Sequence, residues 1–324
     1  MQFTNKLGLP EPIALAISNR EYSRGESDIS VTGLLNPPQL HRLLRLYAKD
    51  IVVDVSESIW ALFGTAVHHI LSSSGSENAI QEERFYMPVG DWVVSGQTDT
   101  YNKLTKKISD YKVTSIYKVQ KGDFDDWTFQ LNAYKLLMEH NKYEVNELEI
   151  IAIIRDWSHS DARNPKNTDY PKAQVLRIPI KIMKPIEILI EIAKRIKALQ
   201  EVQNNSREDL PPCTPKERWA QSDSWLVYNP EKNYTYRRIP VETSTEIPSL
   251  EVASQMAKIQ AESIIAGMST GANYIAKFDP GFSLRCEYFC PVKEFCFQRS
   301  KNTPQAIVDT TPLSTEDIQK ALGS

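Results

Sequence analysis

A nearly unbroken apolar segment, residues 148–157, lies near the middle of this 324-residue chain. Strands that are apolar at almost every position are buried on both faces, so the sheet that contains them needs helices on each side. Segments with helical spacing flank this strand, residues 127–139 before it and residues 184–203 after it. The sequence therefore predicts a mixed α/β core built around a central sheet.

Two periodicities divide the remainder of the chain into helices and strands. Helical spacing begins at Pro38, next to Pro37, and returns over residues 58–71. Short segments that alternate apolar and polar residues are typical of half-buried strands. The predicted strands are residues 82–87 and 92–98 with a turn at 88–91, then 108–114 and 173–180, followed by a hairpin at 224–238 and a helix at 249–266.

Changes in composition divide the chain into four parts. The first part has weak periodicity and several prolines, and we expect an arm laid over the surface. The second contains the α/β core, the third is rich in Pro, Cys, Trp and charge, and the fourth is polar. The predicted parts are an arm at 1–37, a core at 38–204, a cysteine-clustered metal-binding cap at 205–300 and a tail at 301–324.

Charge and hydropathy exclude several classes of protein. The net charge is −3, which excludes a histone-like nucleic-acid binder and leaves room for a local basic groove. The longest aliphatic run, residues 150–154, is too short to cross a bilayer. Residues 1–20 lack the apolar region of a signal peptide. We expect a cytoplasmic protein with no membrane segment.

The first candidate site lies on two neighbouring predicted strands. Asp110 and Lys112 are two residues apart and face the same side of one strand, and Asp99 ends the strand before it. Two carboxylates hold a hard cation such as Mg²⁺, and a nearby lysine stabilises charge that develops on a phosphate. Chance alone supplies Asp/Glu-x-Lys triplets in a chain with 41 acidic residues, so an exposed ion pair is the alternative.

Two helical motifs surround this pair of strands. His68 follows Gly64 by four residues in an apolar helix, and Gln130 and Tyr134 share one face of a later helix. Taken separately, a helical histidine is more often structural, and a Gln–Tyr pair is more often packing. Taken in order, GxxxH, GxxD, DxK and QxxxY form a four-part pattern.

This ordered pattern resembles the PD-(D/E)XK nucleases of the RecB-like group, which includes the iron–sulfur nuclease of CRISPR adaptation. Phage-encoded RecB-like exonucleases are similar in runs such as SGQTD, DYKVTS and IIAIIRDW. The resemblance covers residues 38–300. It implies a restriction-endonuclease-like core, a mixed central sheet flanked by helices.

The resemblance also implies roles for individual residues. His68, Asp99 and Asp110 would bind Mg²⁺ or Mn²⁺ together with the backbone carbonyl of Tyr111, and Lys112 would be the catalytic lysine.

Further residues would support that site. Gln130 and Tyr134 would steady it and contact DNA near the scissile phosphate, and Glu83 would be a second acid beside the ligands. The family's histidine follows G-x-x-x directly, which selects His68 and not His69.

The second candidate site is a set of cysteines. Cys286, Cys290 and Cys296 follow a C-x3-C-x5-C spacing, and Cys213 lies far upstream. The set suits one four-thiolate metal site, although buried free cysteines are also common. Paired C-x2-C knuckles, which are usual for structural Zn²⁺, are absent, and Pro291 follows Cys290. Relatives carry a 4Fe–4S cluster, but they commonly take the first cysteine from before the core, so zinc stays an alternative.

These features predict a metal-dependent DNA exonuclease that acts at free or single-stranded ends in phage recombination or DNA processing. The alternatives are a structure-specific endonuclease, a CRISPR-adaptation nuclease, a non-catalytic DNA-end-binding partner and an interaction protein organised by zinc. The expected partners are single-stranded or duplex DNA ends and a phage recombinase or single-strand-binding protein. Lysines flank the catalytic strand, and aromatic residues near it are candidates for stacking on bases. The lysines are Lys103, Lys106, Lys107, Lys118 and Lys121, and the aromatics are Tyr117, Phe124 and Trp127.

Overall fold

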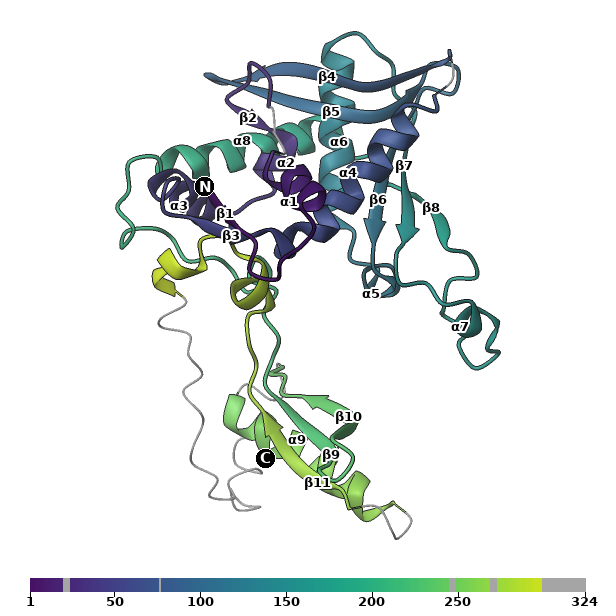
Figure 1. Ribbon diagram of the computed structural model, residues 1–324, viewed down its shortest axis with the longest axis vertical. Coiled ribbons are helices and arrows are strands. Elements are labelled where there is room, and N and C mark those ends of the chain that lie inside the picture. Colours follow the sequence, from purple (N-terminus) through teal and green to yellow (C-terminus); the bar gives the residue numbers. More distant parts are fainter. Residues whose placement is uncertain (20–23, 76, 245–248, 269–272, 299–324) are drawn as a thin grey trace. The chain divides into compact units, whose positions relative to one another are not determined.

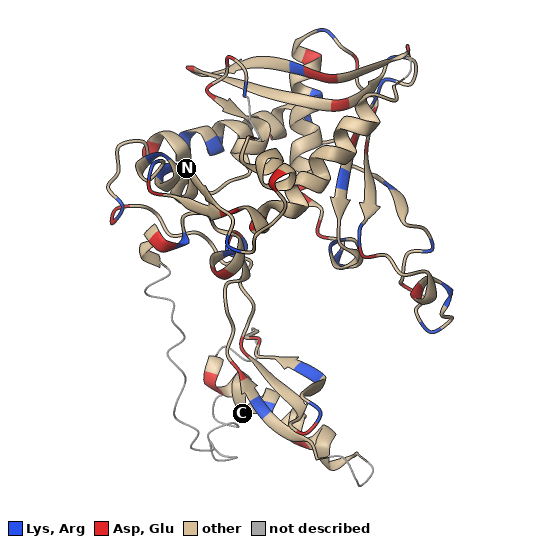
Figure 2. Cartoon of the chain, viewed as in Figure 1, with Lys and Arg blue, Asp and Glu red and all other residues tan. Residues whose placement is uncertain are grey.

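The chain forms two compact units in a computed structural model, Met1–Leu210 and Pro211–Ser324. The structure describes residues 1–19, 24–75, 77–244, 249–268 and 273–298, so the predicted tail at 301–324 lies outside the described residues. Figure 1 shows a mixed α/β first unit and a small α+β second unit. Acidic and basic residues are interspersed along both units (Figure 2).

A six-stranded mixed sheet organises the first unit, with helices packed on it (Figure 1). The strand order is β2-β5-β6-β7-β8, with β4 paired to β5. β4 and β5 form a long antiparallel hairpin, whereas β6 and β7 are parallel and are joined through helices, as parallel neighbours require. The strands are β2 (Ile29–Ser30), β4 (Ala79–Val89), β5 (Trp92–Asn102), β6 (Lys107–Thr114), β7 (Glu147–Ile154) and β8 (Val175–Pro179).

Most of the apolar segment at residues 148–157 forms β7, which lies between β6 and β8 and ends at Ile154, three residues before the predicted end. Ile150, Ala152 and Ile154 are fully buried, while Ile151 and Ile153 on the other face are half-buried. The prediction of an interior strand is confirmed, and its second face is covered less completely than the first.

Helices complete the first unit. α6 packs on β4, β5, β6 and β7, and α8 packs on α6, while α4 contacts β5 and β6. The predicted helices at 58–71, 127–139 and 184–203 are confirmed by α4, α6 and α8. The helices are α1 (Glu11–Ser18), α2 (Val31–Leu34), α3 (Pro38–Leu46), the 3-10 turn η1 (Val55–Ser58), α4 (Ile59–Ser72), α5 (Ile116–Lys121), α6 (Asp125–His140), α7 (His159–Arg163) and α8 (Pro185–Glu201).

The predicted surface arm at residues 1–37 is wrong for its second half. β2 pairs in parallel with β5, and Val31 and Leu34 of α2 are buried in the main core. The Ser30 side chain caps α2 by accepting a hydrogen bond from the Gly33 N–H. An apolar segment this short has no readable period, because one strand pair and one helical turn span only six residues. At the chain start, β1 (Gln2–Thr4) pairs with β3 (Val52–Asp54).

The second unit is a three-stranded antiparallel sheet with one helix packed on it. The sheet has the order β10-β9-β11, with β9 (Ser224–Asn229), β10 (Tyr234–Pro240) and β11 (Ile275–Asp279). α9 (Leu250–Ala266) covers it, and a small core forms between Val227, Ile239 and the helix alanines. The predicted hairpin and helix are confirmed. The short helices η2 (Arg285–Phe289) and η3 (Lys293–Phe295) follow. No helix within the described ranges has the length and apolar character to span a membrane.

Candidate functional site

The candidate site lies where β5 and β6 separate. β4 pairs along one edge of β5, and the other edge pairs with β2 through Val94 and Ser95 and with β6 from Thr100 onward. Asp99 lies between these two ladders, and Asp110 directly follows the last β6 residue paired to β5. The backbone N–H of Tyr111 donates to Asp99 Oδ2 at 2.7 Å across the opening. Asp99 and Asp110 therefore lie at a gap in the sheet, where the backbone pairing of β5 and β6 stops.

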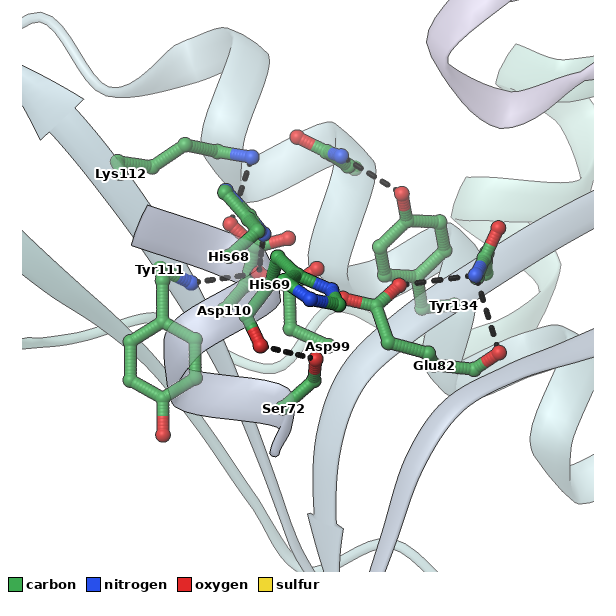
Figure 3. Close-up of polar contacts among 11 residues, drawn as sticks. His68, His69, Ser72, Glu82, Asp99, Asp110, Tyr111, Lys112 and Tyr134 are labelled. Carbon is green, nitrogen blue, oxygen red and sulfur yellow. Dashed lines mark hydrogen bonds and ion pairs between the residues drawn. The ribbon is translucent and has the colours of Figure 1, made fainter. Parts of the chain in front are cut away.

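Helix α4 brings a histidine to this gap. His68 Nδ1 lies 3.3 Å from Asp99 Oδ2, and the imidazole is edge-on to the Tyr111 ring (Figure 3). The hydrogen bond to Asp99 raises the pKa of His68 above its usual value, against the opposing effect of burial. The structure thus brings His68 and Asp99 together as the sequence pattern predicts.

Asp110 and Lys112 form an ion pair beside these two residues. Asp110 Oδ2 lies 2.6 Å from Lys112 Nζ, and both side chains leave β6 on one side, as their spacing predicts. Asp110 is 1% exposed, and this burial raises its pKa to about 6, although the ammonium of Lys112 lowers it in part. The Lys112 side chain keeps 23% of its surface exposed, whereas its partner Asp110 is buried.

A third carboxylate, Glu82 of β4, completes the group. Counting back along the hairpin from the Val89–Trp92 pair places Glu82 opposite Asp99, where like charges repel. Glu82 has a φ of 51° and accepts hydrogen bonds from Gln97 Nε2 on its carbonyl and its carboxylate. Burial, and then Asp99, raise its pKa. Among the described residues, His68, Glu82 and Asp99 are the one set of potential ligands whose atoms all lie within 4.8 Å of one another.

The sequence prediction chose the neighbouring acid, Glu83, and this choice is wrong. Glu83 is exposed, and it is Glu82 that lies with His68 and Asp99. The pairing of Val89 with Trp92 across a two-residue turn at Gly90 and Asp91 sets the register. The turn was predicted only as residues 88–91, which did not fix the pairing. The GD dipeptide was the signal that would have identified Glu82.

Gln130 and Tyr134 support the site from α6. Gln130 Nε2 donates to the Tyr134 hydroxyl at 2.7 Å, and both side chains are buried. The Tyr134 ring lies against Gly96 of β5, where an added Cβ would come within 2.7 Å of the ring. Figure 3 shows Tyr134 in the same view as Glu82 and Asp99. The pair fixes the packing of α6 on β5 beside Asp99, and its contact with DNA stays a prediction.

The lysines around β6 have different surroundings. Lys106 and Lys107, at the start of the strand, are paired with Glu144 and Glu147. Beyond the other end of the strand, on α5, Lys118 Nζ lies 5.3 Å from the Trp127 ring centroid, and Lys121 is near Asp123. DNA contacts of Lys118 and Lys121 stay predictions.

The aromatic residues proposed for base stacking divide in a similar way. Phe124 and Trp127 stack on one another at 5.0 Å, and Trp127 is buried, which leaves its ring unavailable to a base. Tyr117 is exposed on α5.

All four cysteines lie in the second unit, are of intermediate burial and form no disulfide. The Cys213 N–H donates to Gln298 Oε1, and Gln298 Nε2 donates back to the Cys213 carbonyl, so residue 213 is tied to the C-terminal cysteine segment. Burial, followed by the charges of Glu217 and Cys296, raises the pKa of Cys213 to about 12. In the part of the chain that the structure describes, no three of these sulfurs lie within 4.8 Å of one another.

Of the comparisons with known proteins, only the one with solved structures found similar chains. No family model matches the chain, and no curated protein matches it. The crystal structure of SSO0001 is similar at 17% identity over 61% of this chain and 88% of that chain, with a TM-score of 0.42. A phage related exonuclease from Haemophilus somnus 129PT is similar at 12% identity over 60% of this chain and 78% of that chain, with a TM-score of 0.27.

Proposed function

We propose that this protein is a metal-dependent nuclease that hydrolyses DNA phosphodiester bonds at free or single-stranded ends. The observation that carries the proposal is the meeting of four elements at one gap. Helix α4 supplies His68, β4 supplies Glu82, β5 supplies Asp99, and β6 supplies the buried Asp110 with Lys112. A purely structural ion pair has no need of this many carboxylates at one place.

The donor set fits a divalent cation. Asp99 and Glu82 lie opposite one another, so their two ionised carboxylates repel each other. Burial also raises the pKa values of Glu82 and Asp110. A cation relieves both effects, and carboxylate oxygens with one imidazole suit Mg²⁺ or Mn²⁺. We assign His68, Glu82 and Asp99, whose ligand atoms lie within 4.8 Å of one another, as ligands. Asp110, which is paired with Lys112 beside that set, and the Tyr111 carbonyl are proposed as further ligands. The ion would supply Lewis-acid polarisation of the phosphodiester and a lowered pKa for water.

Lys112 acts beside the ligands. Its ammonium holds the Asp110 carboxylate in place and, being partly exposed, is able to donate a hydrogen bond to a phosphate oxygen as negative charge develops there. Gln130 and Tyr134 pack α6 against β5 at Gly96, three residues before Asp99 on the same strand.

The nuclease assay is the direct test of this proposal. With Mg²⁺ or Mn²⁺, the wild type should shorten end-labelled linear DNA, and EDTA should stop it; circular single-stranded DNA separates exonuclease from endonuclease. Glu82→Gln should lower the apparent affinity for the activating metal, measured from the metal concentration that gives half-maximal cleavage, roughly 10- to 100-fold. This is the size typical of groups that tune a metal site. The matched Glu83→Gln should behave as wild type. Binding of DNA without cleavage would instead favour a DNA-end-binding recombination partner.

We also propose that Cys213, Cys286, Cys290 and Cys296 hold a 4Fe–4S cluster. The four thiols share one unit, and the Gln298 hydrogen bonds bring the distant Cys213 to the others' segment. Sulfurs around one Zn²⁺ lie about 3.8 Å apart, because each Zn–S bond is about 2.3 Å. Among the described residues, no three of these sulfurs lie within 4.8 Å of one another, a looser arrangement than that of a closed zinc site and one that is compatible with a larger cluster.

Metal content tests the cluster. Protein purified without oxygen should be brown and contain iron and acid-labile sulfide, and each single Cys→Ser variant should lose most of both, because a cluster with three thiolates is more easily lost. If Cys213→Ser kept its iron while the other three variants lost theirs, Cys213 would be excluded as a ligand. Colourless protein containing stoichiometric zinc would replace the cluster with a structural zinc site.

A further inference from the structure

Helix α4 has an apolar sequence but none of its side chains is fully buried. Trp60 is 57% exposed, Phe63 45% and Ile70 63%. Apolar residues scattered singly on a surface are ordinary, whereas Trp60 and Phe63 lie against one another and form a contiguous exposed aromatic pair. This helix also carries His68 of the candidate site.

An arginine, Arg155, lies over one face of the exposed Trp60 indole. The Arg155 guanidinium lies 4.3 Å from the Trp60 ring centroid, and Phe63 packs edge-on against the same ring. Arg155 directly follows β7, and its N–H donates to the carbonyl of Thr114, the last residue of β6. The indole is thus positioned by the ends of the two central strands, with a cation beside it and much of its surface free.

Gly64 lies between this indole and His68. A Cβ added at Gly64 would meet nothing within 4 Å, so packing within the fold does not require glycine there. Glycine inside a helix lowers stability relative to alanine. A position that the fold does not need as glycine, with open space above it, suits a ligand that passes close to the helix backbone.

We propose that Trp60, with Arg155, is a stacking platform for an unpaired DNA base, and that the strand passes over Gly64 to the site at His68. This proposal rests on the proposed nuclease function. His68 is eight positions after Trp60 on the helix, about 12 Å at 1.5 Å per residue, which is a span of roughly two nucleotides of extended strand. The indole recognises the base, and the guanidinium is complementary in charge to the phosphates beside it. A duplex base has both faces covered, so the platform selects single strands.

Binding without cleavage isolates this contact. We would measure fluorescence anisotropy in EDTA with labelled oligothymidylate, an abasic oligomer of equal length, and a duplex. Trp60→Ala should weaken binding of oligothymidylate roughly 10- to 100-fold, the effect typical of losing one stacked base. It should leave binding of the abasic oligomer and the duplex unchanged, and Trp60→Phe should restore most of the affinity.

Two further variants guard against indirect effects. Ile70→Ala removes an exposed apolar side chain from the same helix without removing a ring, and it should bind as wild type. Gly64→Ala should raise the melting temperature while weakening single-strand binding. Equal losses for thymidylate and abasic oligomers in Trp60→Ala, or no loss at all, would overturn the platform. Because EDTA suppresses cleavage, this result is independent of the nuclease assay, whose failure would overturn the function alone.

Discussion

Asp110→Asn should abolish metal-dependent DNA cleavage and, at the same time, stabilise the metal-free protein at neutral pH. The carboxylate is a proposed metal ligand, and it is almost completely buried. Asparagine keeps its shape, removes its charge and lowers affinity for a hard cation. We expect at least a 1,000-fold loss of cleavage, on the order of 4 kcal/mol in the transition state.

The stabilisation follows from the raised pKa of Asp110. Burial raises that pKa from 3.8 to about 6, so the folded chain binds the proton more tightly than the unfolded chain does. The protonated Asp110 carboxyl therefore contributes its full share to the free energy of unfolding below pH 4, and this contribution is lost as the pH rises to about 6. Above pH 6 the ionised carboxylate destabilises the metal-free fold by roughly 1–3 kcal/mol, and Asp110→Asn removes this cost.

Thermal melts against pH check both parts of this prediction. In EDTA, the variant should melt above wild type at pH 7 and match it near pH 4. Adding Mn²⁺ should raise the melting temperature of wild type much more than that of the variant. Asp91→Asn, in the exposed β4–β5 turn, is the control and should follow wild type throughout. A variant less stable than wild type at neutral pH would contradict the burial argument.

Lys112→Met should also remove cleavage while leaving metal binding in place. Methionine keeps much of the apolar stem and removes the ammonium that stabilises charge on the phosphate. We expect a loss of roughly 100- to 1,000-fold, the range for removing one donor that stabilises developing charge. The pKa of Asp110 should rise further because Lys112 lowers it in the wild type. Lys112→Met should therefore bind metal above pH 7, and on acidification it should lose the metal at a higher pH than wild type does.

Comparing cleavage with the Mn²⁺-induced shift in melting temperature separates these roles. Lys112→Met should lose cleavage and keep the shift, whereas Asp110→Asn should lose both. Lys107→Met is a matched control on the same strand, because Lys107 pairs with Glu147 away from the gap. Full cleavage by Lys112→Met would remove the lysine from the mechanism, and loss of the shift would make it a structural partner of Asp110.

Sequence reasoning identified what depends on local spacing. Asp110 and Lys112 share a strand face because they are two residues apart, and the helices were visible from their period. It missed what depends on distant pairing. Glu82 lies at the site because of the hairpin register, and β2 joins β5 through a segment too short to show a period. Trp60 drew no prediction, because an apolar helix does not reveal which of its faces remains uncovered.

The two-residue turn at Gly90 and Asp91 has a consequence for how this protein can diverge. Glu82 and Asp99 oppose one another because each is the same number of residues from that turn. Side-chain identity at Asp91 is therefore free to drift, and Gly90, with a φ of 59°, is held to glycine by its backbone. A single inserted or deleted residue would slip the ladder and turn the Glu82 side chain to the opposite face of the sheet. Among homologues, the length of this hairpin should be preserved more strictly than its sequence.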